Sequence, residues 1–231
     1  MQTAILLAGR IKGWQYCKES LKRLQDKYNA VFFVSLNAEG PDESSIAFCT
    51  YFNVNPEQIV YIPTQTPEKY RQFHEDGREH NYYSQWFHIK NAFDLCQRYC
   101  NTNNMIFNLV IKYRADIQTD DTLYIENIIP KRFYCPVDPA HQTNDQIAYG
   151  DFQMMYLYSR LIDLYEFFYA NDMLRYGNNK QHVKPTELVL YDYLNILAKY
   201  EKIDIIYIFF NFHLDDRRSR DEPFILNPSL D

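Results

Sequence analysis

The chain has 231 residues, of which 46% are hydrophobic and 17% aromatic, and its formal net charge is −6 at pH 7. This length and composition fit one large domain with a substantial core better than two small domains. The acidic balance argues against non-specific nucleic-acid binding, because that binding depends on Lys and Arg releasing counterions from phosphates.

The five cysteines form no CxxC pair, so they indicate neither a disulfide framework nor a zinc site, and buried thiols fit a reducing compartment. The apolar residues 4–8 are too few for a signal peptide and follow no basic stretch. Residues 203–212 are interrupted by Asp204 and Asn211 and amount to about half of a membrane span. We therefore expect a soluble, cytoplasmic protein without a signal peptide or transmembrane segment.

The first half of the chain alternates strand and helix signals. Continuous apolar runs predict buried strands at residues 3–8 and 30–36, and apolar positions spaced three and four apart predict a helix between them. Residues 44–52 fit a short helix or turn, and residues 58–62 fit a third strand. The polar stretch 64–81 lacks periodicity and predicts a long surface loop, a kind of loop that is often functional.

The second half begins with a strong helical pattern over residues 86–100, followed by a central strand at 105–111. Short strands are expected at 123–129 and 132–135. Residues 143–146 precede the segment 147–150, and a long helix follows with an apolar face from Met154 to Phe168. Residues 171–184 fit a polar loop, and Pro185 opens another helix at a position where its missing N–H costs little. A last strand is expected at 203–212.

This order predicts an α/β sandwich with a mostly parallel central sheet. We expect one domain over residues 1–214, followed by a polar C-terminal tail over residues 215–231.

Ligands of open α/β sheets bind at the carboxyl ends of the strands, so the polar residues that follow each strand are the candidate site. They combine cations, a carboxylate, an imidazole and a small residue, which suits a diphosphate with a divalent metal such as Mn²⁺ or Mg²⁺. These residues are Gly9, Arg10 and Lys12, then Ser35 and Asn37, then Arg114 and Asp116, and finally His213.

Five of these residues also have a structural explanation. Arg114 and Asp116 fit an ordinary salt-bridged strand end, and Arg10 and Lys12 fit solvated charges. His213 fits a core or surface histidine.

Five short segments together resemble GT-A-type glycosyltransferases, particularly those of large DNA viruses and of bacterial surface-polysaccharide clusters. They span most of the chain in the expected order: AILLAGR at 4–10, VFFVSLN at 31–37, NLVIKYRAD at 108–116, NDQIAYG at 144–150 and PTELVLY at 185–191. The resemblance implies a GT-A-like, Rossmann-like fold and sugar transfer from a nucleotide-sugar such as a UDP-sugar to a hydroxyl of a glycan or other acceptor.

In such enzymes a DxD-like signature ends a central strand and holds a metal on the donor diphosphate. The resemblance places that role on Asp116, although Arg114 stands where the first Asp would be. Because only one carboxylate remains, we expect His213, at the same edge of the sheet, to be a further metal ligand. It also implies that Gly9 and Arg10 line the nucleotide pocket and that Asn37 reaches the base or ribose.

The resemblance places Asn144 and Asp145 on the acceptor side, which makes Asp145 the candidate general base. A helix N-cap is the alternative explanation for these two residues. Two other functions stay open: a non-catalytic module that binds a glycan or a partner, and a nucleotidyltransferase.

Overall fold

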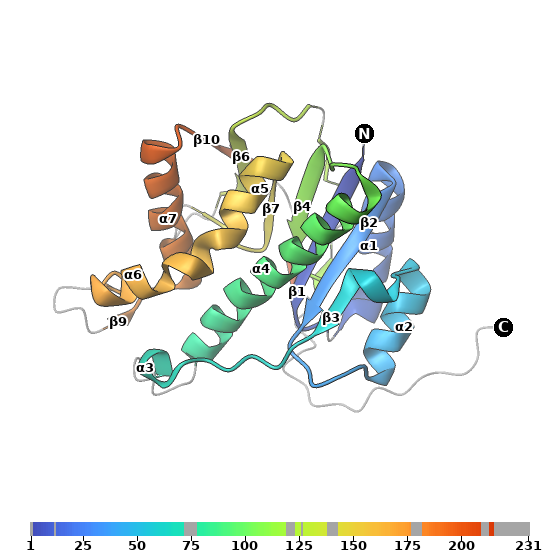
Figure 1. The fold of residues 1–231 in the computed structure, drawn as a ribbon, viewed down its shortest axis with the longest axis horizontal. Helices are drawn as coiled ribbons and strands as arrows, with labels where there is room; N and C mark the ends of the chain where they lie inside the picture. Colours follow the sequence, from blue (N-terminus) through green and yellow to red (C-terminus); the bar gives the residue numbers. More distant parts are fainter. Residues whose placement is uncertain are drawn as a thin grey trace.

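A seven-stranded mixed sheet organises the fold (Figure 1). The computed structural model describes residues 2–11, 13–71, 78–118, 123–125, 127–137, 143–176, 182–208 and 213–214. The strands run in the order β10 (Asp204–Ile208), β6 (Arg132–Pro136), β7 (Ile147–Gly150), β4 (Leu109–Tyr113), β1 (Thr3–Gly9), β2 (Ala30–Leu36) and β3 (Ile59–Tyr61). Neighbouring strands are parallel except at β7, which is antiparallel to both β4 and β6. The predicted α/β class and mostly parallel sheet are confirmed.

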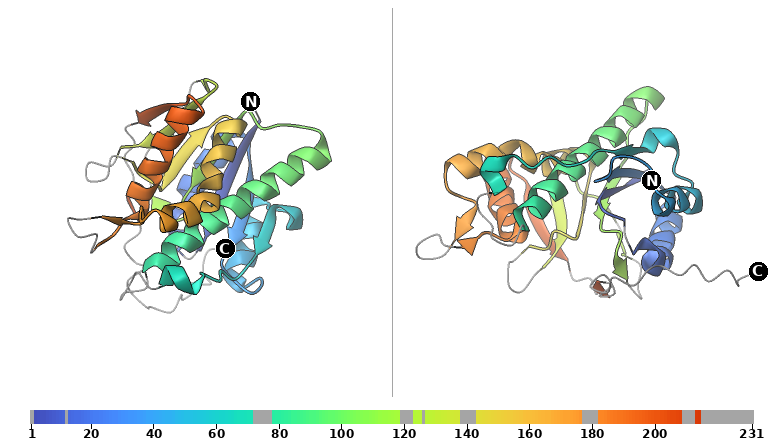
Figure 2. Two further views of the ribbon diagram at one scale, coloured as in Figure 1. Left: turned by 60° about the vertical axis from the view of Figure 1, so that its left-hand side comes forward. Right: turned by 90° about the horizontal axis from the view of Figure 1, so that it is seen from below.

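Helices cover both faces of this sheet (Figures 1 and 2). Along β1, Ile5 and Leu7 pack in one hydrophobic cluster with two helices, α1 (Trp14–Tyr28) and α2 (Glu43–Phe52). Ala4 and Leu6 pack on the other face, in a cluster with α4 (Arg78–Asn103), α5 (Phe152–Ser159) and α7 (Thr186–Tyr200). Because both faces are covered, the strand reads as a continuous apolar run rather than an alternating one.

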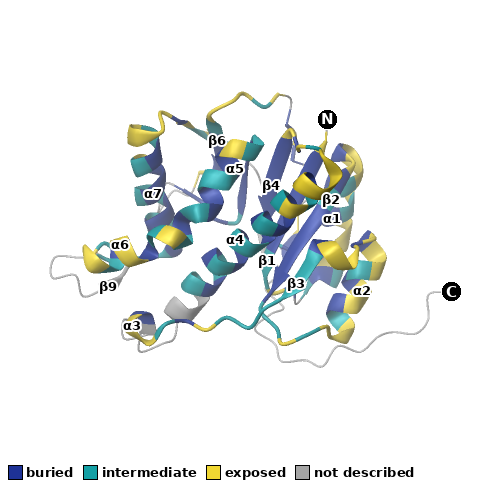
Figure 3. Ribbon diagram, in the orientation of Figure 1, coloured by how far each residue is buried: buried dark blue, intermediate teal, exposed yellow. Residues whose placement is uncertain are grey.

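Helix α4 is the main element on its face of the sheet and lies across β1 and β2 (Figures 1 and 3). Its Trp86 is fully buried and donates a 2.9 Å hydrogen bond from Nε1 to Oγ1 of Thr186, at the start of α7. Burial of a large apolar side chain stabilises a fold by about 1.5–3 kcal/mol. Trp86 therefore ties α4 to both the core and α7.

The loop predicted at residues 64–81 is wrong in part. It contains α3 (Glu68–Arg71), and α4 begins at Arg78, eight residues before the start of the strong periodic pattern. The buried Tyr70 packs against Tyr83 and Tyr165, with ring centroids 5.5 and 5.1 Å apart. Since a single aromatic side chain docks α3, the sequence shows no helical period there. Residues 72–77 of this stretch lie outside the described residues.

The central strand is displaced from its predicted bounds. It runs over Leu109–Tyr113 instead of 105–111, because Asn108 and Leu109 already donate to the backbone oxygen of Gln2 and bring the chain alongside β1 there. Ile106, counted as part of the strand, is exposed. The strand predicted at 123–129 does not form in its described residues, where Leu123 and Ile125 instead pack as an irregular segment bonded to the hydroxyl of Tyr28.

Three further bounds differ from expectation. The helix predicted over residues 154–168 is α5, a 3₁₀ turn (Arg160–Leu164) and α6 (Tyr165–Ala170). The predicted polar loop 171–184 includes a small hairpin of β8 (Arg175–Tyr176) and β9 (His182–Val183). Of the last strand predicted at 203–212, β10 covers Asp204–Ile208, and residues 209–212 lie outside the described residues. The next strand is β11 (His213–Leu214), which pairs with β5 (Ile117–Gln118).

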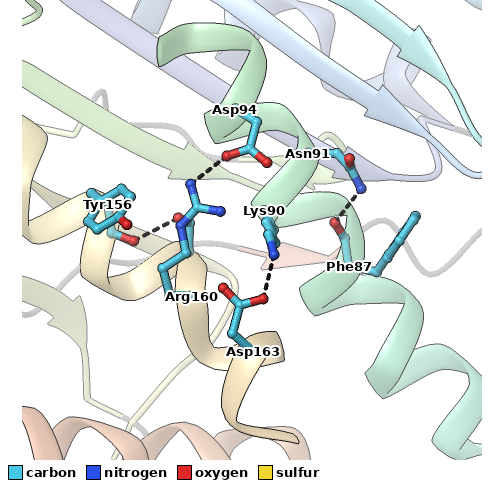
Figure 4. A network of polar contacts seen from close by, with 8 residues as sticks. Phe87, Lys90, Asn91, Asp94, Tyr156, Arg160 and Asp163 are labelled. Carbon is cyan, nitrogen blue, oxygen red and sulfur yellow. Dashed lines mark hydrogen bonds and ion pairs between the residues drawn. The ribbon is translucent and has the colours of Figure 1, made fainter. Parts of the chain in front are cut away.

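The 3₁₀ turn docks on α4 through two ion pairs (Figure 4). Arg160 pairs with Asp94, and Lys90 pairs with Asp163. The Arg160 guanidinium also lies 4.6 Å from the ring centroid of Tyr156. These partly exposed contacts help to hold the break in the helix against α4.

None of the helices described here is long and apolar enough to cross a membrane.

Candidate functional site

Four chain segments meet at the carboxyl edge of the sheet beside the amino-terminal half of α4 (Figure 1). In the parallel register of β1 and β4, Leu6 lies opposite Lys112, so both strands end at this edge. Because β7 is antiparallel, its first residue Ile147 lies opposite Tyr113, the last residue of β4. The loop that enters β7 therefore reaches the same edge as the segments that leave β1, β2 and β4.

Gly9 ends β1 in a left-handed conformation, with φ of +89°. A Cβ added at this position would meet no atom within 4 Å, so the glycine is needed for its backbone and not for space. Its carbonyl accepts a 2.8 Å hydrogen bond from the backbone N–H of Asn37, which fixes the ends of β1 and β2 together. The resulting strand end is uncrowded where a ligand would approach.

Arg114 and Asp116 form the salt bridge that was the structural alternative for this pair. Nε of Arg114 lies 2.8 Å from Oδ1 of Asp116. The Asp116 side chain is only 1% exposed, whereas that of Arg114 is 35% exposed. A turn closed by the backbone hydrogen bond from Ile117 to Arg114 holds the two side chains on one side of the chain. Asp116 is thus the inner partner and Arg114 the outer one.

Lys112 and Asp145 make a second buried polar cluster on the α4 face. The Lys112 ammonium donates to the backbone oxygen of Asp145, and both residues are buried. Burial lowers the pKa of Lys112 to about 8, although the nearby Asp145 carboxylate acts in the opposite direction. Gln85 of α4 donates a 2.6 Å hydrogen bond to Oδ2 of Asp145. Within the described part of the chain, Oδ1 of Asp145 has no hydrogen-bond partner.

The N-cap explanation of Asn144 and Asp145 is wrong. These residues precede strand β7 rather than a helix, and Asp151 caps α5 by accepting a 2.7 Å hydrogen bond from the N–H of Met154. Asn144 instead accepts a 2.8 Å hydrogen bond from the N–H of Gln146, which makes an Asx-type turn. That turn aims the Asp145 carboxylate at Gln85.

A third polar cluster surrounds His88 of α4, which is fully buried. Its Nδ1 lies 2.8 Å from the hydroxyl of Ser35, and its Nε2 lies 2.7 Å from the hydroxyl of Thr64. Burial lowers the pKa of His88 to about 4, so the ring is neutral at neutral pH. Ser84 lies 2.9 Å from Thr64 and accepts a 3.3 Å hydrogen bond from Asn37, which extends the cluster to the end of β2.

Sequence reasoning missed the contribution of α4. His88 lies four residues after Ser84 and three after Gln85, so its side chain is on the same side of the helix as each of these two polar side chains. That face touches the β2 end through His88 and the β7 end through Gln85. The sequence feature that could have identified this face is the presence of polar residues on a helix whose buried positions are otherwise apolar.

For the remaining predicted site residues, the described part of the structure gives no side-chain contact at the site. Arg10 is exposed beyond the end of β1, and Lys12 lies outside the described residues. His213 is described by its backbone, which pairs with Gln118 two residues beyond Asp116. Gly9, Asn37, Arg114, Asp116 and Asp145 all lie at the predicted edge of the sheet.

The described residues around Asp116 do not by themselves form a metal centre. Among the side chains that the structure describes, no group of three or more His, Cys, Asp or Glu could hold a metal ion. The Oδ1 atom of Asp116 bonds to a guanidinium, and a positive charge at that position opposes a metal cation. The expected Mn²⁺ or Mg²⁺ stays a prediction.

Comparison with known proteins adds no family: no protein-family model matches this chain, and neither does any curated protein. The fold and site thus define an α/β protein with a polar site at the carboxyl edge of a mostly parallel sheet.

Proposed function

We propose that the protein is a glycosyltransferase that moves a sugar from a nucleotide-sugar to a hydroxyl of a glycan or other acceptor. The observation that carries the proposal is the arrangement of Arg114 and Asp145, which end or enter the adjacent strands β4 and β7 at one edge. The reaction needs a cation beside the diphosphate that leaves and a base beside the hydroxyl that attacks. These two residues offer both groups.

On the donor side, the uncrowded end of β1 at Gly9 and the outward guanidinium of Arg114 suit the diphosphate. Asn37, already fixed by Ser84 and by the N–H of Thr64, suits the base or ribose. Arg10 is exposed and adds positive charge near this end of the sheet.

On the acceptor side, Asp145 acts as the general base. Gln85 holds Oδ2, and Lys112 holds the backbone of the same residue, so Oδ1 is the oxygen left to take a proton. Oδ1 accepts the acceptor's hydroxyl proton while that oxygen bonds to the anomeric carbon. The bond from this carbon to the diphosphate breaks, and the nucleoside diphosphate leaves with its electron pair.

The test is to incubate the full chain with UDP-, GDP- and dTDP-sugars and a panel of saccharide acceptors, and to measure nucleoside diphosphate release and glycan products by mass spectrometry. Transfer with at least one donor is expected, together with a thermal shift by that donor. A protein that binds saccharides but transfers no sugar would be a binding module. Pyrophosphate release from a nucleoside triphosphate and a sugar phosphate would identify a nucleotidyltransferase. Either result overturns the proposal.

A further inference from the structure

We propose that Asp116 is not a metal ligand but a positioning residue that holds the Arg114 guanidinium as the anchor for a diphosphate, so that binding needs no divalent metal. This inference rests on the proposed function for the identity of the ligand as a nucleoside diphosphate. Its physical content is the anion site itself, which is tested separately below.

The geometry of the pair assigns the two roles. Arg114 uses Nε for Asp116, and no residue in the described ranges partners its two Nη nitrogens. A guanidinium held at Nε presents these two nitrogens as a planar fork, which matches two oxygens of a phosphate. Since Arg114 is 35% exposed and Asp116 1% exposed, the cation is the partner that a ligand meets.

The surroundings of Arg114 suit an anion. The end of β1 at Gly9 has no atom within 4 Å of the position of an added Cβ, and β1 is the neighbour of β4 in the sheet. Lys112 lies two residues before Arg114 and contributes a buried positive charge on the same side of the strand. Asp145 and Glu187 partly offset the charge of Lys112, whereas among the described residues Asp116 is the one carboxylate that pairs with Arg114.

The bond to the buried Asp116 carboxylate lowers the entropic cost of binding an anion at Arg114. An exposed arginine loses side-chain entropy when it binds an anion, and an arginine already fixed by a charge-assisted bond loses less. The turn between Arg114 and Ile117 fixes Asp116 in turn, so the guanidinium is oriented by the backbone of the strand end. A metal ion on Asp116 would have to share the carboxylate with the guanidinium bonded to Oδ1, and the two positive charges would repel each other.

The experiment is titration calorimetry of the full chain with inorganic pyrophosphate and with UDP, in EDTA and again in excess Mn²⁺. Both ligands are expected to bind in EDTA, with a Kd within about threefold of that in Mn²⁺. Arg114→Gln is expected to weaken binding at least tenfold and Arg114→Lys severalfold, because lysine lacks the fork. Asp116→Asn is expected to weaken binding by the same factor with and without Mn²⁺.

Arg132→Gln is the matched control, because Arg132 is also a strand-terminal arginine, 37% exposed, with Nε 3.5 Å from Asp204. Arg132 is the first residue of β6, so it lies at the edge of the sheet opposite to Arg114. Its replacement should leave pyrophosphate binding unchanged. Circular dichroism checks that each variant folds. If a variant does not fold, the comparison of binding by the unaltered chain in EDTA and in Mn²⁺ still tests the inference.

Binding that disappears in EDTA, or that survives Arg114→Gln, overturns the inference. Pyrophosphate binding through Arg114 without any sugar transfer would leave the anion site standing and remove the proposed function. The two proposals therefore fail through different measurements.

Discussion

Gln85 and Asp145, which are 60 residues apart in the sequence, are joined by a 2.6 Å hydrogen bond from the side-chain amide to Oδ2 of the carboxylate. Asp145 is only 3% exposed, so this bond provides one of the few interactions that replace its hydration. An unpaired buried carboxylate is costly, and Gln85 thus stabilises both the fold and the orientation of Asp145.

Replacement of Gln85 with Leu should lower the free energy of unfolding by about 1–3 kcal/mol, because one oxygen of a buried carboxylate loses its donor. Urea unfolding followed by circular dichroism measures this loss. Gln85→Glu is the shape-matched comparison, and it should be at least as destabilising since it places a second carboxyl against Asp145. A Gln85→Leu variant as stable as the unaltered chain would contradict the assigned bond.

Asp145→Asn should reduce sugar transfer at least a hundredfold while the Kd for UDP changes less than threefold. General-base catalysis is worth about 10²–10⁴ in rate, and an amide cannot take the proton. Transfer rates and calorimetric affinities measure the two effects. Asp151→Asn, at the N-cap of α5, is the control that should leave transfer intact. Unchanged transfer by Asp145→Asn would remove Asp145 from the chemistry.

His88 should make the fold sensitive to acid. Burial lowers its pKa in the folded chain from 6.5 to about 4, so the unfolded chain binds more protons between these values. Stability from this group is fully present above pH 6.5 and is lost as the pH falls toward 4. At about 1.4 kcal/mol per pKa unit, the loss is on the order of 3 kcal/mol.

The measurement is urea unfolding at pH 7 and pH 4.5 for the unaltered chain and for His88→Gln. The variant keeps a polar side chain beside Ser35 and Thr64 but does not titrate, so its stability should change less between the two pH values. Equal pH dependence in both proteins would show that other groups cause the acid sensitivity.

Lys112 should make the stability of the fold depend on pH in the alkaline range. Its pKa falls from 10.5 in the unfolded chain to about 8 in the folded one, so the unfolded chain again binds more protons between these values. Stability should therefore rise with pH from about 8 upward. Lys112→Met removes this rise, and the stability of the unaltered chain relative to the variant should increase between pH 7.5 and 9.5. A constant difference over that range would contradict the lowered pKa.

The fold was predictable where apolar patterning was strong. The runs around Ile5 and Phe33 lie in strands that are buried on both faces, so sequence hydrophobicity alone identifies them. The carboxyl-edge rule then brought Gly9, Asn37 and Arg114 together before the strand order was known. The antiparallel direction of β7 was not predicted, because a four-residue buried strand has no pattern that encodes direction.

The site was less predictable because its supporting residues have no motif. His88 and Gln85 are single polar residues on a mostly apolar helix face, and only the docking of α4 on the sheet gives them partners. Asp145 was expected at the site through family resemblance, whereas the turn made by Asn144 that orients it follows from tertiary structure. Lys112 lies one residue beyond the predicted end of the central strand at residue 111, although the strand continues past it to Tyr113.

The polar face of α4 joins the two sides of this edge mechanically. His88 and Ser84 hold the end of β2, while Gln85, on the same helical turn, holds the entrance to β7. A fluctuation that lifts this turn of the helix would break both sets of bonds together. We therefore expect the proposed nucleotide side and the proposed acceptor side to open together, as one local unfolding unit that includes this turn of α4.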